Sequence, residues 1–282
     1  MKLKRILIIV AVCIIFCICF YTMNKHYDIL SRYPYDNEEA KELIRNYMNE
    51  EEIGYIIEYS IAPESFIDYI KCPKFNIYHV SLYRQVGGYC FYMSNDDVVL
   101  LTEEIISKTD KYEEAIKLLE HYRYNEVLYY LENGDPYNPE STLIINPEET
   151  NILLDNKHTI SIHIPYRLEN ITDDIQARPE VIEAYNRFCE LVDSTYESKK
   201  CGGIKLEKGY ISYDDYEKLY QENELNSFPG HNEHQTGLAL DLNLKKSIFK
   251  DEDMIKWLKE NLYTFNFDIY QCDFSEYHIR YK

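Results

Sequence analysis

The chain of 282 residues is short of positive charge. Lysine and arginine together number 30, against 49 aspartates and glutamates, which gives a formal net charge of −19 at pH 7. A protein this acidic is repelled by the phosphate backbone of DNA or RNA. We therefore expect no nucleic-acid partner.

Cysteine is present, but without the spacing of a metal site. Of the 8 cysteines, three lie in an apolar N-terminal run, and no two of the others form a C-x-x-C pair. These others are Cys72, Cys90, Cys189, Cys201 and Cys272. Structural zinc sites pair their cysteines closely, and disulfide frameworks usually use an even set. We expect no cysteine-bound zinc and no disulfide framework, and at most a pair or two of oxidised cysteines.

A cleavage signal is missing from the apolar N-terminus. The run from Ile6 to Met23 carries no charge, and no A-x-A-like site follows it. At about 1.5 Å per residue, such a run approaches the ~30 Å hydrocarbon thickness of a bilayer. The basic residues before it, in "MKLKR", favour a cytoplasmic N-terminus. We expect a retained transmembrane anchor over residues 1–24, with the rest of the chain outside the cell.

Residues 25–139 have the pattern of a helical region. Leu43, Ile44 and Tyr47 follow a helical period among acidic side chains, and Asn37, preceded by Asp36, is placed to cap that helix. The turn-rich stretch "ENGDPYNPES" then ends the region. We expect a membrane-proximal helical module that packs or docks, with a protein partner as a candidate ligand.

Residues 140–282 mix strand and helix patterns. The runs "STLIINP" and "HTISIHIPYR" are rich in β-formers, and the alternation of Ile160, Ile162 and Ile164 predicts a half-buried strand. His158 and His163 fall in or beside it, and we expect them to be surface or packing histidines. Further strands and helices follow in mixed order, which predicts an α+β domain with an antiparallel sheet.

The stretch "GHNEHQTGLALDLNL" concentrates polar residues before an alternating strand. Its four leucines share one face, so Asp241 lies on the opposite face and needs a partner there. His234 lies seven residues earlier, and an imidazole with a carboxylate can bind zinc. His231 competes with His234 as a ligand, and the period does not choose between them. A solvent-facing or salt-bridged Asp241 is the alternative.

The last residues, "FSEYHIRY", could complete such a site. In a strand, Glu276, His278 and Arg280 project from one face. A catalytic zinc usually takes three protein ligands and one water. His278 could be the third ligand, and Glu276 could accept a proton from the water.

The two motifs together resemble the VanY-type zinc D-Ala-D-Ala carboxypeptidases. The family pattern reads P-G-x-S-E-H-Q-T-G-L-A-x-D and later E-P-W-H-x-R-Y, and the likeness covers about residues 140–282. The resemblance implies that His234, Asp241 and His278 bind zinc and that Glu276 is the catalytic base. His231 falls at a variable position, and we expect it and Glu233 to be surface neighbours. The implied reaction is hydrolysis of a terminal D-Ala-D-Ala bond in peptidoglycan stem peptides, which suits an outward-facing anchored enzyme.

The likeness fails where the substrate carboxylate is expected to bind. The family segment S-G-Y-R-S corresponds to "KGYIS", so Ile211 stands where the arginine should be. Isoleucine cannot make the charge-assisted contact of a guanidinium. Tyr210, Asn232 and Arg280 remain as candidate substrate contacts.

This departure keeps two alternatives open. A D,D-endopeptidase acting on wall cross-links would need no carboxylate clamp at that site. A catalytically weak wall-binding or scaffold protein would also fit an altered clamp. The D,D-carboxypeptidase is the leading hypothesis.

Overall fold

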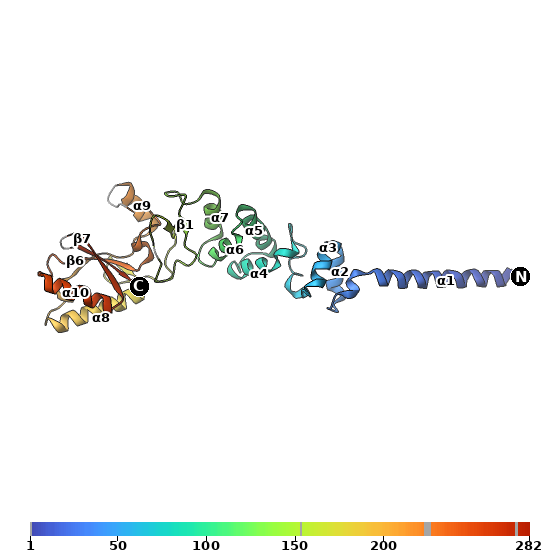
Figure 1. The fold of residues 1–282 in the computed structure, drawn as a ribbon, viewed down its shortest axis with the longest axis horizontal. Helices are drawn as coiled ribbons and strands as arrows, with labels where there is room; N and C mark the ends of the chain where they lie inside the picture. The colour runs from blue at the N-terminus through green and yellow to red at the C-terminus, as the bar shows by residue number, and fades with distance from the viewer. Residues whose placement is uncertain (1, 153, 223–226, 274–275) are drawn as a thin grey trace. The chain divides into compact units, whose positions relative to one another are not determined.

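The structure is a computed structural model that describes residues 2–152, 154–222, 227–273 and 276–282. Within these ranges the side chains of residues 2–8, 24–27 and 271–273 are not described. The chain divides into two compact units, Met1–Ile116 and Lys117–Lys282 (Figure 1). The turn-rich stretch that ends the predicted helical module lies inside the second unit.

The first unit is helical. Its elements are α1 (Lys2–Tyr27), η1 (Ile29–Arg32), α2 (Glu38–Tyr47), α3 (Glu50–Glu58), η2 (Pro63–Ser65), η3 (Ile77–His79), α4 (Val80–Tyr89), α5 (Asn95–Lys108) and most of α6 (Tyr112–Leu118). Asn37 caps α2 by accepting a hydrogen bond from the Ala40 amide at 3.0 Å. Asn49 and Glu52 form a capping box at the start of α3. Side-chain caps therefore begin both α2 and α3.

Helix α1 includes residues 2–24 of the predicted anchor. Among the described residues, no helix combines the length and the apolar character that crossing a bilayer requires. The anchor predicted for residues 1–24 falls in part outside the described side chains.

The second unit is of the α+β type. It contains α7 (Tyr124–Asn133), β1 (Thr142–Leu143), β2 (His158–Thr159), β3 (Glu169–Asn170), β4 (Gln176–Ala177), α8 (Pro179–Thr195), η4 (Cys201–Gly203), β5 (Lys205–Lys208), α9 (Tyr213–Gln221), η5 (Glu233–Thr236), β6 (Ala239–Asn243), α10 (Glu252–Thr264), β7 (Phe267–Asp273) and β8 (Glu276–Tyr281). A four-stranded sheet has the order β5-β6-β8-β7 with every neighbouring pair antiparallel. The predicted fold class, α+β with an antiparallel sheet, is confirmed for this unit.

The core of the second unit covers one face of that sheet. The leucines of β6 and its flanks, with Tyr277 and Ile279 of β8, pack against buried residues of α8 and α10. The helices that contribute them lie close together in Figure 1. Burying a leucine side chain is worth about 1.5–3 kcal/mol, so this packing fixes which face of β6 points inward. The alternate residues, Asp241 among them, are thereby held on the other face.

The prediction of a half-buried strand through Ile160, Ile162 and Ile164 is wrong. Strand β2 ends at Thr159, and only Ile160 is buried, while Ile162 and Ile164 are 42% and 67% exposed. Ser161, between Ile160 and Ile162, has a φ of 51°, in the left-handed region that interrupts an extended chain. The alternating sequence therefore does not produce a strand with one buried and one exposed face here.

One disulfide joins two neighbouring elements of the second unit. Cys189 of α8 is bonded to Cys201 of η4. Cys72 and Cys90 are free and buried in the first unit, and the side chain of Cys272 lies outside the described residues. Among the cysteines whose side chains the structure describes, this one pair falls within the expected limit, and it closes a short loop.

Candidate metal centre

Strands β6 and β8 place two polar side chains directly opposite each other. Asp241 pairs with His278 in the antiparallel register, while their neighbours Leu242 and Tyr277 pair on the core face. Opposite residues on one face of a sheet have Cβ atoms about 4.5–5.5 Å apart. Asp241 Oδ1 consequently lies 2.9 Å from His278 Nδ1.

A short 3₁₀ turn, η5, brings His234 to the same point. The turn begins at Asn232, whose side chain accepts a hydrogen bond from the His234 amide at 2.9 Å. It ends at Gly237, which has a φ of 70°, in the left-handed region that favours glycine, and a Cβ atom there would lie 2.9 Å from the Leu168 side chain. The ring of His234 then lies with Nε2 3.2 Å from Asp241 Oδ1.

The outer nitrogen of each histidine has its own acceptor. The Gly209 carbonyl lies 2.7 Å from His234 Nδ1, and Glu233 Oε2 lies 3.0 Å from His278 Nε2. A neutral imidazole that donates from one nitrogen offers a lone pair on the other. These acceptors therefore direct His234 Nε2 and His278 Nδ1 toward Asp241 as potential metal ligands.

The geometry of this cluster suits a tetrahedral divalent metal ion. One donor atom each from His234, Asp241 and His278 lies within 4.8 Å of the others. Two ligands at 2.0–2.1 Å from a tetrahedral ion are about 3.3 Å apart. The observed donor separations of 2.9 and 3.2 Å are close to that value, so little movement is needed to admit an ion.

The charges in the cluster favour a cation. Burial alone would raise the pKa of Asp241, but hydrogen bonds with His234 and His278 outweigh it and hold the pKa well below its usual range. Burial lowers the pKa of His278, yet Asp241 and Glu233 together raise it to about 9. Asp241 therefore stays ionised near neutral pH, and a metal ion would compete with one proton on His278.

Glu276 lies beside the cluster at the start of β8. Its side chain is exposed and shares the strand face of His278, two residues later. A cavity of about 230 Å³ is lined by Glu207, Lys208, Asp241, Leu242, Asn243, Glu276 and Tyr277. A carboxylate in this position can exchange a proton with a water molecule in the cavity.

The comparison with protein families assigns the part of the chain that holds this cluster. Residues 181–282 match the VanY family, described as D-alanyl-D-alanine carboxypeptidase. This segment is VanY-like. The three clustered side chains and Glu276 all lie within it.

Two curated relatives share the VanY likeness. A D-alanyl-D-alanine carboxypeptidase of Enterococcus faecium is 26% identical over 182 residues, which are 54% of this chain and 58% of the relative. YodJ of Bacillus subtilis, described as a candidate carboxypeptidase, is 27% identical over 120 residues, 33% of this chain and 44% of the relative. The chain thus spans about half the length of the curated relatives it matches.

Solved structures also resemble part of the chain. The LD-carboxypeptidase LdcB has a TM-score of 0.38 and 21% identity, covering 50% of this chain and 80% of its own. The D,D-pentapeptidase VanY of a VanB-type resistance cassette, solved with Zn(II), has a TM-score of 0.35 and 20% identity, covering 47% and 87%.

His231 lies outside the metal cluster, in a buried contact of its own. Its side chain and that of Asp135 are each 1% exposed, and His231 Nε2 lies 3.5 Å from Asp135 Oδ1. Its Nδ1 lies 2.6 Å from the Asp155 carbonyl. Against the effect of burial, these acceptors raise the pKa of His231, and the imidazole in turn helps to lower the pKa of Asp135. The expectation of a surface neighbour is wrong for His231.

Glu233 is also more than a surface neighbour in this VanY segment. One oxygen accepts from His278, and the other lies 3.0 Å from Arg280 Nε. The side chain of Arg280 is 10% exposed, and its Nη2 donates to the carbonyls of Thr150 and Ile152. Glu233 therefore joins a metal-facing histidine to a buried arginine.

The predicted substrate contacts lie in different settings. The Asn232 amide donates to Tyr216 Oη at 2.8 Å and Ser227 Oγ at 2.9 Å. The ring of Tyr210 is half-buried, and burial raises the pKa of its hydroxyl. Internal contacts thus occupy Asn232 as well as Arg280, and Lys208 lines the site without having been singled out from the sequence.

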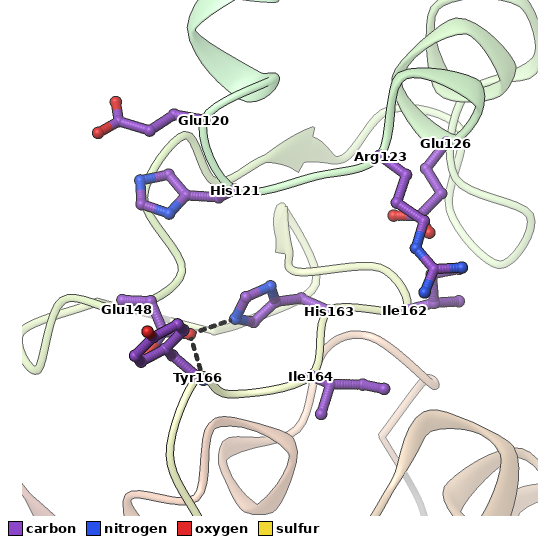
Figure 2. A pocket seen from close by; sticks show the side chains of 9 residues that line it. All are labelled: Glu120, His121, Arg123, Glu126, Glu148, Ile162, His163, Ile164 and Tyr166. Carbon is purple, nitrogen blue, oxygen red and sulfur yellow. Dashed lines mark hydrogen bonds and ion pairs between the residues drawn. The ribbon is translucent and has the colours of Figure 1, made fainter. Parts of the chain in front are cut away.

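A second cavity of about 590 Å³ shares no lining residue with the metal cluster (Figure 2). Figure 2 shows His163 and Glu148 in contact on its wall, with their Nε2 and Oε1 atoms 2.7 Å apart. Tyr122 packs edge-on against the His163 ring, with centroids 5.7 Å apart. This is the packing role that we expected for His163.

Proposed function

We propose that the protein is a zinc-dependent D,D-carboxypeptidase that removes the terminal D-alanine from peptidoglycan stem peptides. The observation that carries the proposal is the gathering of His234, Asp241 and His278 next to Glu276, within a segment of the VanY family. The Enterococcus faecium relative bears the name of this activity. Zinc is the expected metal because two imidazoles and a carboxylate with an open fourth position form a typical catalytic zinc set.

Each residue then has a defined task. His234, Asp241 and His278 would hold the ion, which when bound polarises the scissile carbonyl and lowers the pKa of a water molecule. Glu276 accepts a proton from the attacking water as its oxygen bonds to the carbonyl carbon. Glu276 then gives that proton to the leaving amine as the C–N bond breaks. Glu233 and the Gly209 carbonyl keep the two rings in the required orientation.

We also propose that residues 1–24 anchor the enzyme to the cell membrane, with the VanY segment outside. The uncharged run and the basic residues before it support this orientation. The Cys189–Cys201 disulfide suits an oxidising compartment outside the cytoplasm. An enzyme held there would meet its cell-wall substrate.

One observation favours a second candidate function. The Ile211 amide lies 3.3 Å from the His234 carbonyl, so Ile211 adjoins η5, the turn that carries His234. The side chain of Ile211 cannot pair with a carboxylate. A D,D-endopeptidase cleaving a wall cross-link would have no free carboxylate to bind there.

The test uses the zinc-loaded full chain in detergent, with two substrates. One is a pentapeptide that ends in D-Ala-D-Ala, and the other is a cross-linked muropeptide. We expect release of D-alanine from the pentapeptide. The Glu276→Gln variant should bind the same amount of zinc but lose about 10²–10⁴-fold in kcat. Cleavage of the cross-linked fragment alone would support the endopeptidase, and bound zinc without turnover of either would support the weak wall-binding or scaffold protein.

A further inference from the structure

Strand β5 contains a β-bulge directly beside the metal cluster. Leu206 pairs with Leu242 on the core face, and Lys208, rather than Glu207, pairs with Asp241. In a regular ladder Glu207 would lie opposite Asp241, and Lys208 would return to the core face. The extra residue therefore brings the lysine onto the face of the metal cluster, as bulges near active sites often do.

The ammonium group of Lys208 is only loosely held. Its Nζ lies 3.9 Å from Asp241 Oδ2, at the outer limit of an ion pair, and its side chain is 45% exposed. The other oxygen of that carboxylate, Oδ1, faces the two histidines. Such a long, exposed ion pair restrains the lysine side chain only weakly. Lys208 can therefore turn toward a ligand in the 230 Å³ cavity that it lines.

Other basic side chains near the site are engaged elsewhere. Arg280 is bound to Glu233 and two carbonyls, and Lys205 pairs with Glu207 at 2.9 Å without lining the cavity. Among the described residues that line the cavity, Lys208 is the only cation, and the other charged ones are acidic. An anionic group entering this cavity would need that lysine to offset the repulsion.

We propose that Lys208 binds the C-terminal carboxylate of the substrate and so selects peptides with a free C-terminus. The inference rests on the proposed carboxypeptidase function, in which this carboxylate lies one residue beyond the scissile bond. Ile211 offers no charge for it, whereas the bulge places the ammonium of Lys208 beside Asp241 on the cavity wall. Lysine binds a carboxylate as a point charge, without the bidentate geometry of arginine.

The experiment compares two peptides of the same sequence. One ends in D-Ala-D-Ala with a free carboxylate, and the other carries a C-terminal carboxamide. The zinc-loaded full chain is assayed as wild type, Lys208→Met, Lys208→Arg and Lys205→Met. The last is a matched control from the same strand.

We expect wild type to prefer the free acid by about tenfold or more in KM. Lys208→Met should raise KM for the acid by about tenfold, with kcat and the constants for the amide changing by less than about threefold. Lys208→Arg should keep the preference, and Lys205→Met should behave as wild type.

The outcomes separate this inference from the proposed function. An unchanged acid preference in Lys208→Met would overturn the role of Lys208 and leave the carboxypeptidase standing. An equal loss on both peptides, or loss of bound zinc, would show that Lys208 only supports Asp241, and would also overturn it. If zinc-loaded wild type cleaves neither peptide, the proposed function fails and this inference fails with it.

Discussion

At the scale of single residues, the side chains behind the metal cluster matter as much as those in it. Glu233 accepts from His278 and contacts Arg280, and so fixes the ring that faces Asp241. Such supporting groups set both the orientation and the basicity of a metal-binding histidine.

Replacing Glu233 should therefore weaken the metal site. We expect Glu233→Gln to lower zinc affinity about 10–100-fold, because the charged partner of His278 is lost. Competition with a fluorescent chelator measures this affinity. Glu207→Gln is the matched control, since Glu207 lines the 230 Å³ cavity with Asp241 but contacts Lys205 and Asn243 rather than a metal-facing histidine. Equal affinities for wild type and Glu233→Gln would contradict the assignment.

The buried pair of His231 and Asp135 should make stability depend on pH. The pKa of His231 is raised above 6.5, so its contribution is complete below that pH and is lost as pH rises through the folded value. The pKa of Asp135 is lowered below 3.8, so its contribution is present above that pH and is lost as pH falls. Their joint effect should be largest between pH 3.8 and 6.5.

Urea unfolding of wild type and His231→Gln measures this dependence. At pH 6 the variant should lose about 3–5 kcal/mol, because it leaves the Asp135 carboxylate buried without its charged partner. The difference should shrink as the pH is raised toward 9. A difference that stays the same from pH 6 to pH 9 would argue against a charged pair.

At the scale of elements, sequence patterns predict the structure correctly where local residues determine the conformation of the segment. The alternation in β6 places its leucines in the core and Asp241 on the open face, as its letters indicate. The same pattern fails around Ile162, because the backbone turns at Ser161. The burial of His231 depends on Asp135 and Asp155, far away in the chain, and the bulge that aims Lys208 exists only in the paired strands. No local pattern could reveal those features.

The link between α8 and η4 gives a prediction for the second unit. Cys189 and Cys201 are 12 residues apart, and a disulfide closing such a loop stabilises by about 2–4 kcal/mol. The double replacement by serine should lower the free energy of unfolding by this amount. Reductant should destabilise wild type to the same extent and leave the double variant unchanged. A wild type that is insensitive to reductant would mean that the bond does not form.

At the scale of the whole molecule, the chain combines an apolar N-terminus with an acidic remainder. We expect the full chain to remain in the membrane fraction through high-salt and carbonate washes, because an apolar helix rather than charge would hold it. Deleting residues 1–24 should release it into the soluble fraction. A full-length chain that is soluble from the start would refute the anchor.

The central claim is that His234, Asp241 and His278 form a catalytic zinc site. Elemental analysis of the purified full chain, paired with D-alanine release before and after chelation, tests it most directly. We predict about one zinc per chain, activity that is lost on chelation and restored by zinc, and neither zinc nor activity in Asp241→Asn. A folded wild-type chain that binds no zinc, or that releases D-alanine equally well without it, would contradict the claim.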